Sequence, residues 1–118
     1  MGTLKLGTIA EILDATFLTD QDDLDMEIPC AFSSALISDI LESTKEPTLL
    51  LTDLTNPQII RLADMIDLLG IVMVRGKLPS EDVIRMAKVR NLPLLSTRYT
   101  LYKSSGMLYS NGLRSCKI

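Results

Sequence analysis

The chain has 118 residues, of which 47% are hydrophobic and 23% are charged, and its formal net charge is −3. This length and composition predict one folded domain over residues 1–118 and exclude a disordered chain. The acidic balance and the presence of only five aromatic residues, three Tyr and two Phe, argue against nucleic-acid binding, which needs a basic face.

The sequence contains no histidine. This excludes Ser-His-Asp and Cys-His catalysis and every histidine metal site. Cys30 and Cys116 are too few for a thiolate zinc site within one chain, and we expect neither a metal nor a cofactor. Two reduced thiols are the favoured state because cytosolic disulfides are rare, and a disulfide between these cysteines is the alternative.

No apolar run approaches the about 20 residues that span a bilayer. The first residues also lack the basic segment and apolar core of a signal peptide. We therefore expect a cytoplasmic protein with no membrane partner.

Residues 1–14 have the apolar spacing of an amphipathic helix, and residues 15–18 predict a short strand. The acidic turn over residues 19–23 suggests calcium binding, but it lacks the ordered ligands, the central glycine and the closing glutamate of an EF-hand loop. A solvated turn is the favoured interpretation.

Residues 27–32 predict a strand, and Pro29 is typical of an edge strand or a strand start. Ser33 or Ser34 is then expected to cap a helix that runs to about Leu41.

Residues 48–97 predict the order strand, helix, strand, helix, strand. The apolar runs at 49–51, 71–74 and 94–95 do not alternate with polar residues, which is typical of strands covered on both faces. The repeated order predicts an α/β fold with three layers, α/β/α, around a mostly parallel central sheet.

Pro57 suits the first position of the first of these helices, with Asn56 as its N-cap, and we expect this helix to extend to Leu69 and close at Gly70. Ser80 is expected to cap the second helix and Asn91 to end it.

Thr100 is expected to cap a last helix that stops at Asn111 and Gly112. We expect residues 113–118 to fray.

The order of elements resembles the DRTGG domain family, named for an Asp-Arg-Thr-Gly-Gly pattern. The resemblance is best over residues 34–113, through the segments SALISDIL, LLLTDLTNPQIIRLAD and GIVMVRGKLPSEDVIRMAKVRNLPLLSTRYTLY. Asp53 matches the acidic position of the family pattern and Gly76 matches a glycine, while Leu54 stands where a basic residue is usual.

The resemblance implies a fold similar to the N-terminal domain of HPr kinase/phosphorylase. It also implies a regulatory role, because the family includes regulatory regions of some phosphotransacetylases and inserts beside CBS domains in some inorganic pyrophosphatases. The chain would be a stand-alone member.

In open α/β sheets, ligands bind outside the carboxyl ends of the strands. Forked guanidinium donors there can hold a phosphate or a carboxylate, and an aspartate can accept from a ribose or an amine. The predicted ligand-binding residues are Ser34, Thr52, Asp53, Thr55, Asn56, Arg75, Gly76, Ser96, Thr97 and Arg98. Caps and turns are the structural alternative for these residues.

Our first hypothesis is a non-enzymatic regulatory or sensor module that binds a nucleotide-like ligand or a phosphorylated metabolite at the strand ends. The alternative is a protein-interaction module that acts through homodimerisation without a ligand. A mean hydropathy of +0.25 and a surplus of large apolar residues motivate it, namely Met65, Leu68, Met73, Met86 and Met107. A small transferase with a Ser-Lys dyad or a carboxylate pair is a third alternative.

Overall fold

A computed structural model describes residues 2–20 and 23–117 of the chain. Its centre is a six-stranded sheet in the order β2-β7-β6-β5-β4-β8. The strands β4, β5, β6, β7 and β8 are parallel and β2 is antiparallel, so the prediction of a mostly parallel sheet is confirmed. The strand bounds are Thr16–Phe17 (β2), Cys30–Ser33 (β4), Thr48–Thr52 (β5), Leu68–Met73 (β6), Leu94–Ser96 (β7) and Arg114–Ser115 (β8).

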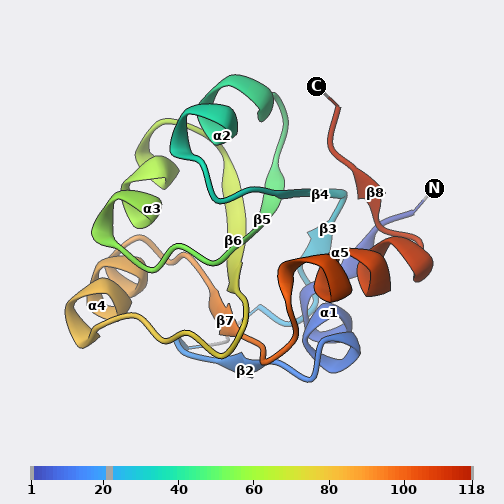
Figure 1. The fold of residues 1–118 in the computed structure, drawn as a ribbon, viewed down its shortest axis with the longest axis horizontal. Coiled ribbons are helices and arrows are strands. Elements are labelled where there is room, and N and C mark those ends of the chain that lie inside the picture. Colours follow the sequence, from blue (N-terminus) through green and yellow to red (C-terminus); the bar gives the residue numbers. More distant parts are fainter. Residues whose placement is uncertain (1, 21–22, 118) are drawn as a thin grey trace.

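Helices cover both faces of this sheet, which confirms the three-layer arrangement (Figure 1). The helices α2, α3 and α4 lie on one side, and α1 and α5 lie on the other. Their bounds are Leu6–Ile12 (α1), Ile37–Ser43 (α2), Pro57–Arg61 (α3), Glu81–Val89 (α4) and Leu101–Ser110 (α5), with a 3₁₀ turn, Leu62–Asp64 (η1), after α3.

All five residues of β5 are buried, and their side chains alternate between two cores. Leu49 and Leu51 enter the core under α1 and α5, whereas Leu50 enters the core under α2, α3 and α4. Adjacent residues of β6 divide in the same way, with Val72 in the first core and Ile71 in the second. The apolar runs lack alternation because both sides of each strand face protein.

Three predicted helix caps are confirmed. The side chains of Asn56, Ser80 and Thr100 each accept a hydrogen bond from the backbone N–H three residues later. These bonds satisfy donors that the first turn of a helix leaves free.

The helix expected over residues 57–69 is shorter than predicted. It ends after α3 and η1, and β6 begins at Leu68. Gly70 therefore lies within a strand instead of closing a helix. It is the register partner of Leu49 in β5.

The strand expected over residues 27–32 is divided by Pro29, which has no N–H for a ladder. The first part, β3 (Glu27–Ile28), pairs antiparallel with β1 (Leu4–Lys5) in a separate two-stranded sheet. β1 occupies part of the helix expected over residues 1–14, whose first residue, Met1, lies outside the described residues.

The helix expected after Ser33 or Ser34 also begins later, at Ile37. Ser33 is the last residue of β4. The hydroxyl of Ser34 accepts a hydrogen bond from the Leu36 N–H at 3.0 Å, which forms a turn before the helix instead of a cap.

The fraying expected for residues 113–118 is wrong for the described part, 113–117, because β8 pairs in parallel with β4. The favoured state of two reduced thiols is also wrong, because Cys30 and Cys116 form a disulfide. Pairing of the two strands brings the two Cα atoms within 4.8 Å, a separation that a disulfide accommodates.

In the described part of the chain, no helix has the length and apolar character required to cross a membrane.

Because β5 is buried on both faces of the sheet, we predict that its adjacent leucines contribute equally to the free energy of unfolding. We expect Leu50→Ala and Leu51→Ala each to lower the free energy of unfolding by about 2–5 kcal/mol, because each leaves a cavity in a different core. Urea unfolding measures both values. The control Val89→Ala, at a residue that is 80% exposed, should change the free energy by less than about 0.5 kcal/mol. A near-zero value for either leucine variant would contradict the two-core arrangement.

Candidate functional site

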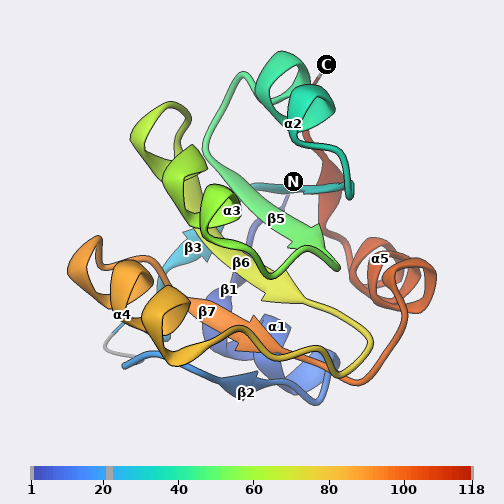
Figure 2. The same ribbon diagram turned by 60° about the vertical axis from the view of Figure 1, so that its left-hand side comes forward.

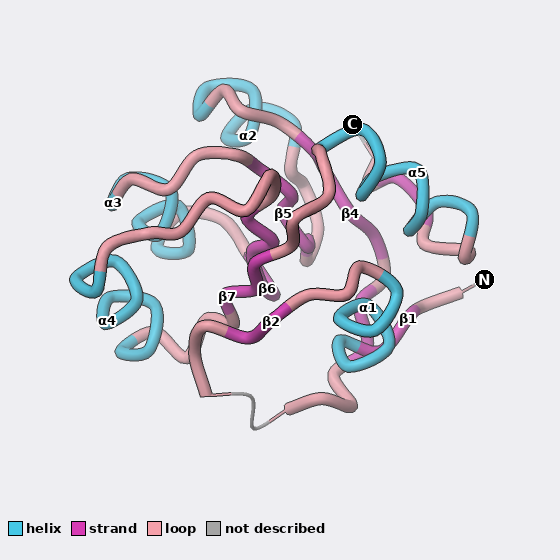
Figure 3. The backbone as a smooth tube through the Cα atoms, turned by 60° about the horizontal axis from the view of Figure 1, so that its bottom comes forward, coloured by secondary structure: helices cyan, strands magenta, loops and turns pink. Residues whose placement is uncertain are grey.

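The carboxyl ends of β4, β5, β6 and β7 lie at one edge of the sheet because these strands are parallel. Figure 2 shows the arrows of β5, β6 and β7 pointing the same way, and the loops that leave them can be followed in Figure 3. We call this edge the rim and define it as residues 34, 52–56, 75–77 and 96–98. The predicted site residues are therefore assembled in one region of the molecule.

Asp53 forms ion pairs with two cations of the rim. Its Oδ2 lies 3.1 Å from Arg75 Nη1 and 3.8 Å from Lys77 Nζ. Asp53 follows β5, and the two cations follow β6, so this cluster joins two of the loops. Both cations are about half exposed, and such an exposed ion pair contributes less than about 1 kcal/mol to stability.

The loop after β6 has an unusual backbone. Arg75 and Gly76 both adopt the left-handed region, with φ of 64° and 70°. Glycine takes this conformation freely, whereas for arginine it costs about 1–2 kcal/mol. Two backbone hydrogen bonds hold this turn, from Arg75 N to Tyr99 O at 2.8 Å and from Gly76 N to Thr97 O at 2.9 Å. The loops after β6 and β7 are thereby locked together.

Several predicted residues have structural roles. The Thr52 hydroxyl accepts a hydrogen bond from the Leu54 N–H, and Asn56 caps α3. Thr97 is buried and donates to the Leu13 carbonyl at 2.6 Å, which ties the rim to the end of α1. These residues build the rim.

The remaining predicted residues differ in exposure. Arg98 is exposed, and Thr55 is half-buried. Ser96 is also half-buried and pairs with Thr16 and Met73 in the sheet. Arg98 therefore joins Arg75 and Lys77 as a cation of the rim that solvent reaches.

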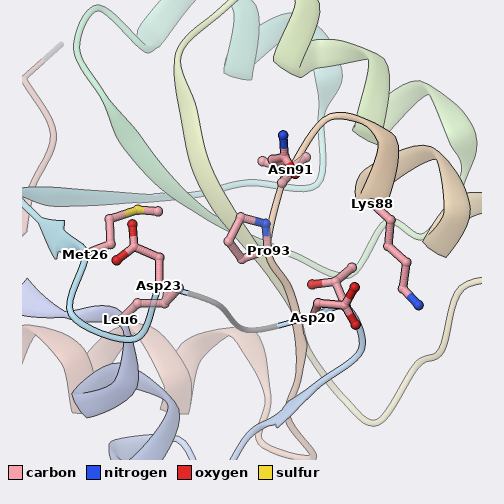
Figure 4. Close-up of a pocket in the computed structure, with 9 residues that line it drawn as sticks. Leu6, Asp20, Asp23, Met26, Lys88, Asn91 and Pro93 are labelled. Atoms are coloured by element: carbon pink, nitrogen blue, oxygen red, sulfur yellow. The ribbon is translucent and has the colours of Figure 1, made fainter.

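Two well-formed cavities lie away from the rim, and neither is lined by a predicted site residue. The first, of about 280 Å³, lies where the chain enters β7, and Figure 4 shows Asp20, Lys88, Asn91 and Pro93 around it. The acidic turn expected over residues 19–23 borders this cavity, but Gln21 and Asp22 lie outside the described residues.

The second cavity, of about 440 Å³, lies between α5, β4 and β8, and we call it the α5–β8 cavity. One end reaches Ser33, whose hydroxyl lies 2.7 Å from that of Ser105. Its lining is mostly apolar and includes two exposed tyrosines of α5, Tyr102 and Tyr109. Sequence reasoning missed this cavity because β8 was expected to fray.

A charged cluster beside the α5–β8 cavity, which includes the lining residue Arg114, was also missed by the sequence analysis. The Glu46 carboxylate accepts two hydrogen bonds from Arg114, at 3.0 and 3.2 Å, and one from the Lys117 N–H at 2.7 Å. The bonds from Arg114 are the main cause that lowers the pKa of Glu46 to about 2. Glu46 and Arg114 are 68 residues apart, so no local pattern in the sequence could reveal the pair.

The lowered pKa of Glu46 predicts a pH dependence of stability. A depressed pKa contributes stability above the unfolded value, and this contribution is lost as pH falls through the folded value. We expect Glu46→Gln to be less stable than the parent protein at pH 6, with the difference shrinking as the pH falls from 4.5 toward 2. Urea unfolding across this range measures the difference.

The matched control for this experiment is Glu42→Gln, at an exposed glutamate of α2. We expect the free energy of unfolding of this variant to follow that of the parent protein at every pH. A Glu46→Gln difference that stays constant between pH 6 and pH 2.5 would contradict the role of Glu46.

The chain matches the model of one protein family. A model described as the DRTGG domain matches residues 8–110. Among solved structures, the chain is similar to the CBS and DRTGG domains of the regulatory region of Clostridium perfringens pyrophosphatase, crystallised with its activator, diadenosine tetraphosphate. The TM-score is 0.64 at 15% identity, over 88% of this chain and 45% of that one. No curated protein matches the chain.

At this identity the similarity is one of fold. This chain spans less than half the length of the pyrophosphatase regulatory region.

Proposed function

The chain belongs to the DRTGG domain family, and from this premise we propose that it is a non-enzymatic regulatory module of the cytoplasm. Its proposed ligand is a nucleotide or a phosphorylated metabolite that binds at the rim. The observation that carries the proposal is the cluster of Asp53 with Arg75 and Lys77 where the loops after β5 and β6 meet.

The chemistry of the rim supports an anionic ligand. Arg75 has five N–H donors in a fixed fork and uses one of them on Asp53, which leaves donors free for a phosphate. Arg98 adds a second guanidinium from the loop after β7. A phosphate held between these loops would replace part of the interaction that Arg75 makes with Asp53.

The backbone of the rim supports binding as well. Strained residues persist where the surrounding structure holds them, and they gather at binding sites and switches. The backbone of Arg75 is held in this way by the Tyr99 carbonyl, so the start of its side chain is positioned before a ligand arrives. Preorganisation of this kind lowers the entropy cost of binding.

The similar solved structure supports a nucleotide as the class of ligand. The regulatory region of the pyrophosphatase is complexed with diadenosine tetraphosphate, an activator. We extend only the chemical class, a nucleotide with several phosphates, to this chain. A regulatory role without catalysis is supported by Asp53, which pairs with cations instead of a second carboxylate.

Calorimetric titration with adenine and guanine nucleotides tests the proposal. We expect binding by at least one of them, and a dissociation constant raised about 10- to 100-fold in Arg75→Ala, since a hydrogen bond to a charged group contributes about 1.5–3 kcal/mol. Arg98→Ala should weaken binding in the same direction. Arg61→Ala, at an exposed arginine near the far end of α3, is the control and should bind as the parent protein does.

Two outcomes would overturn the proposal. One is the absence of heat or of a thermal shift with every nucleotide and phosphorylated metabolite tested at millimolar concentration. The other is a ligand whose affinity is equal in the parent protein, Arg75→Ala and Arg98→Ala.

A second candidate function is protein interaction through homodimerisation. It is favoured by α5, where Tyr102 and Tyr109 are 91% and 72% exposed beside the mostly apolar α5–β8 cavity. Exposed tyrosines are enriched in protein interfaces, because their rings bury a large area at a small entropy cost.

Light scattering of the parent protein at high concentration tests this second function. We expect the mass of a dimer, and the mass of a monomer for the variant Tyr102→Ser/Tyr109→Ser at the same concentration. Val89→Ser is the control, because it alters another exposed residue on α4 and should leave the mass unchanged. A monomeric parent protein would remove homodimerisation as a function.

A further inference from the structure

The disulfide links two segments that are far apart in the sequence. Cys30 is the first residue of β4 and Cys116 follows β8, with a separation of 86 residues. Both residues are buried, although Arg114, Ser115 and Lys117 around Cys116 are exposed. A reductant therefore reaches the sulfur atoms when the segment 114–117 opens.

The surroundings of the two sulfur atoms suit both oxidation states. Cys30 Sγ lies 3.4 Å from the Pro47 carbonyl oxygen, and Cys116 Sγ lies 3.5 Å from the Thr48 hydroxyl oxygen. These oxygen atoms are hydrogen-bond acceptors, and a reduced thiol is a weak donor. Each thiol that reduction creates can donate to one of these oxygen atoms while the segment 114–117 is still closed.

The disulfide is a large part of what attaches β8 to the sheet. Among the described residues, no single contact is as important for the other parallel strands. It has only two residues and lies at the edge of the sheet, paired with β4 alone. Its other attachments are the Cys116 N–H bond to the Ala31 carbonyl at 3.0 Å and the bonds to Glu46. A short edge strand held by a few exposed contacts opens readily once its covalent link is cut.

Opening of β8 would change the α5–β8 cavity. Arg114 and Ser115 form one wall of this cavity, and Leu113 contributes to the wall at the junction with α5. The disulfide therefore fixes the wall in place. After reduction, the wall formed by β8 could move relative to the rest of the cavity.

We propose that Cys30 and Cys116 form a reversible thiol–disulfide latch that fixes β8 and the α5–β8 cavity. This inference does not depend on the ligand proposed for the rim. In the cytoplasm, where the protein is proposed to act, disulfides are usually transient or redox-sensing. This favours a reversible disulfide over a permanent structural one.

The chemistry is an exchange with a dithiol reductant. One thiolate of the reductant attacks a latch sulfur, the Cys30–Cys116 bond breaks, and the second cysteine leaves as a thiolate that takes up a proton. The second thiolate of the reductant then attacks the mixed disulfide. Two cysteine thiols and an oxidised, disulfide-bonded reductant result, so two electrons pass from the reductant to the protein.

The test compares the full chain treated with diamide and with dithiothreitol. Intact mass spectrometry should give a mass 2 Da lower for the oxidised monomer, the two hydrogens lost when two thiols join. Hydrogen exchange should be faster after reduction in peptides that cover residues 113–117 and unchanged in α4. The melting temperature should fall by about 10–20 °C on reduction, as expected for loss of a disulfide that closes a long loop.

The variant Cys30→Ser/Cys116→Ser is the control for effects of the reagents. Its exchange and melting should match the reduced parent protein and should not respond to either reagent. If this variant does not fold, comparison of the two states of the parent protein is sufficient. Two free thiols after oxidation, or equal exchange of residues 113–117 in both states, would overturn the latch.

Discussion

Every residue of β5 is buried, and its leucines point alternately into two separate cores. This constraint requires helices on both faces of the sheet, which are supplied by the crossovers α2, α3, α4 and α5 between parallel strands and by α1, which precedes β2. Because each crossover returns the chain to the same starting edge, the strands β4 to β7 all end at the opposite edge. The burial of the central strands thus determines where the polar loops gather.

The rim is a consequence of that arrangement, and its internal contacts give it a definite form. Asp53 holds Arg75 and Lys77, while the backbone of Arg75 and Gly76 is fixed by carbonyl groups of the loop after β7. The charged side chains remain half exposed. The rim therefore combines a fixed backbone with cations that solvent reaches.

The sequence was a good guide wherever the determining interactions are local. The caps Asn56, Ser80 and Thr100 act within one helical turn, and the parallel strands follow from unbroken apolar runs, so these features were predicted correctly. The DRTGG resemblance is likewise confirmed by the match over residues 8–110.

The failures involve contacts between distant residues. The end of the helix that starts at Pro57 was misplaced because Gly70, a plausible helix stop, instead lies within β6, in register with Leu49 of β5. β8 and the Glu46–Arg114 pair were missed, and the Cys30–Cys116 disulfide was only the alternative, because each joins residues at least 68 positions apart. The ligand-binding roles of the rim residues stay a prediction, while their structural roles as caps and turns are visible in their hydrogen bonds.

Amide chemical-shift mapping during a nucleotide titration tests whether a phosphorylated ligand binds where the parallel strands end. We expect shifts concentrated in residues 52–56, 75–77 and 96–98, the loops that leave β5, β6 and β7. Shifts confined to α5 and β8, or no shifts at millimolar nucleotide, would contradict this prediction.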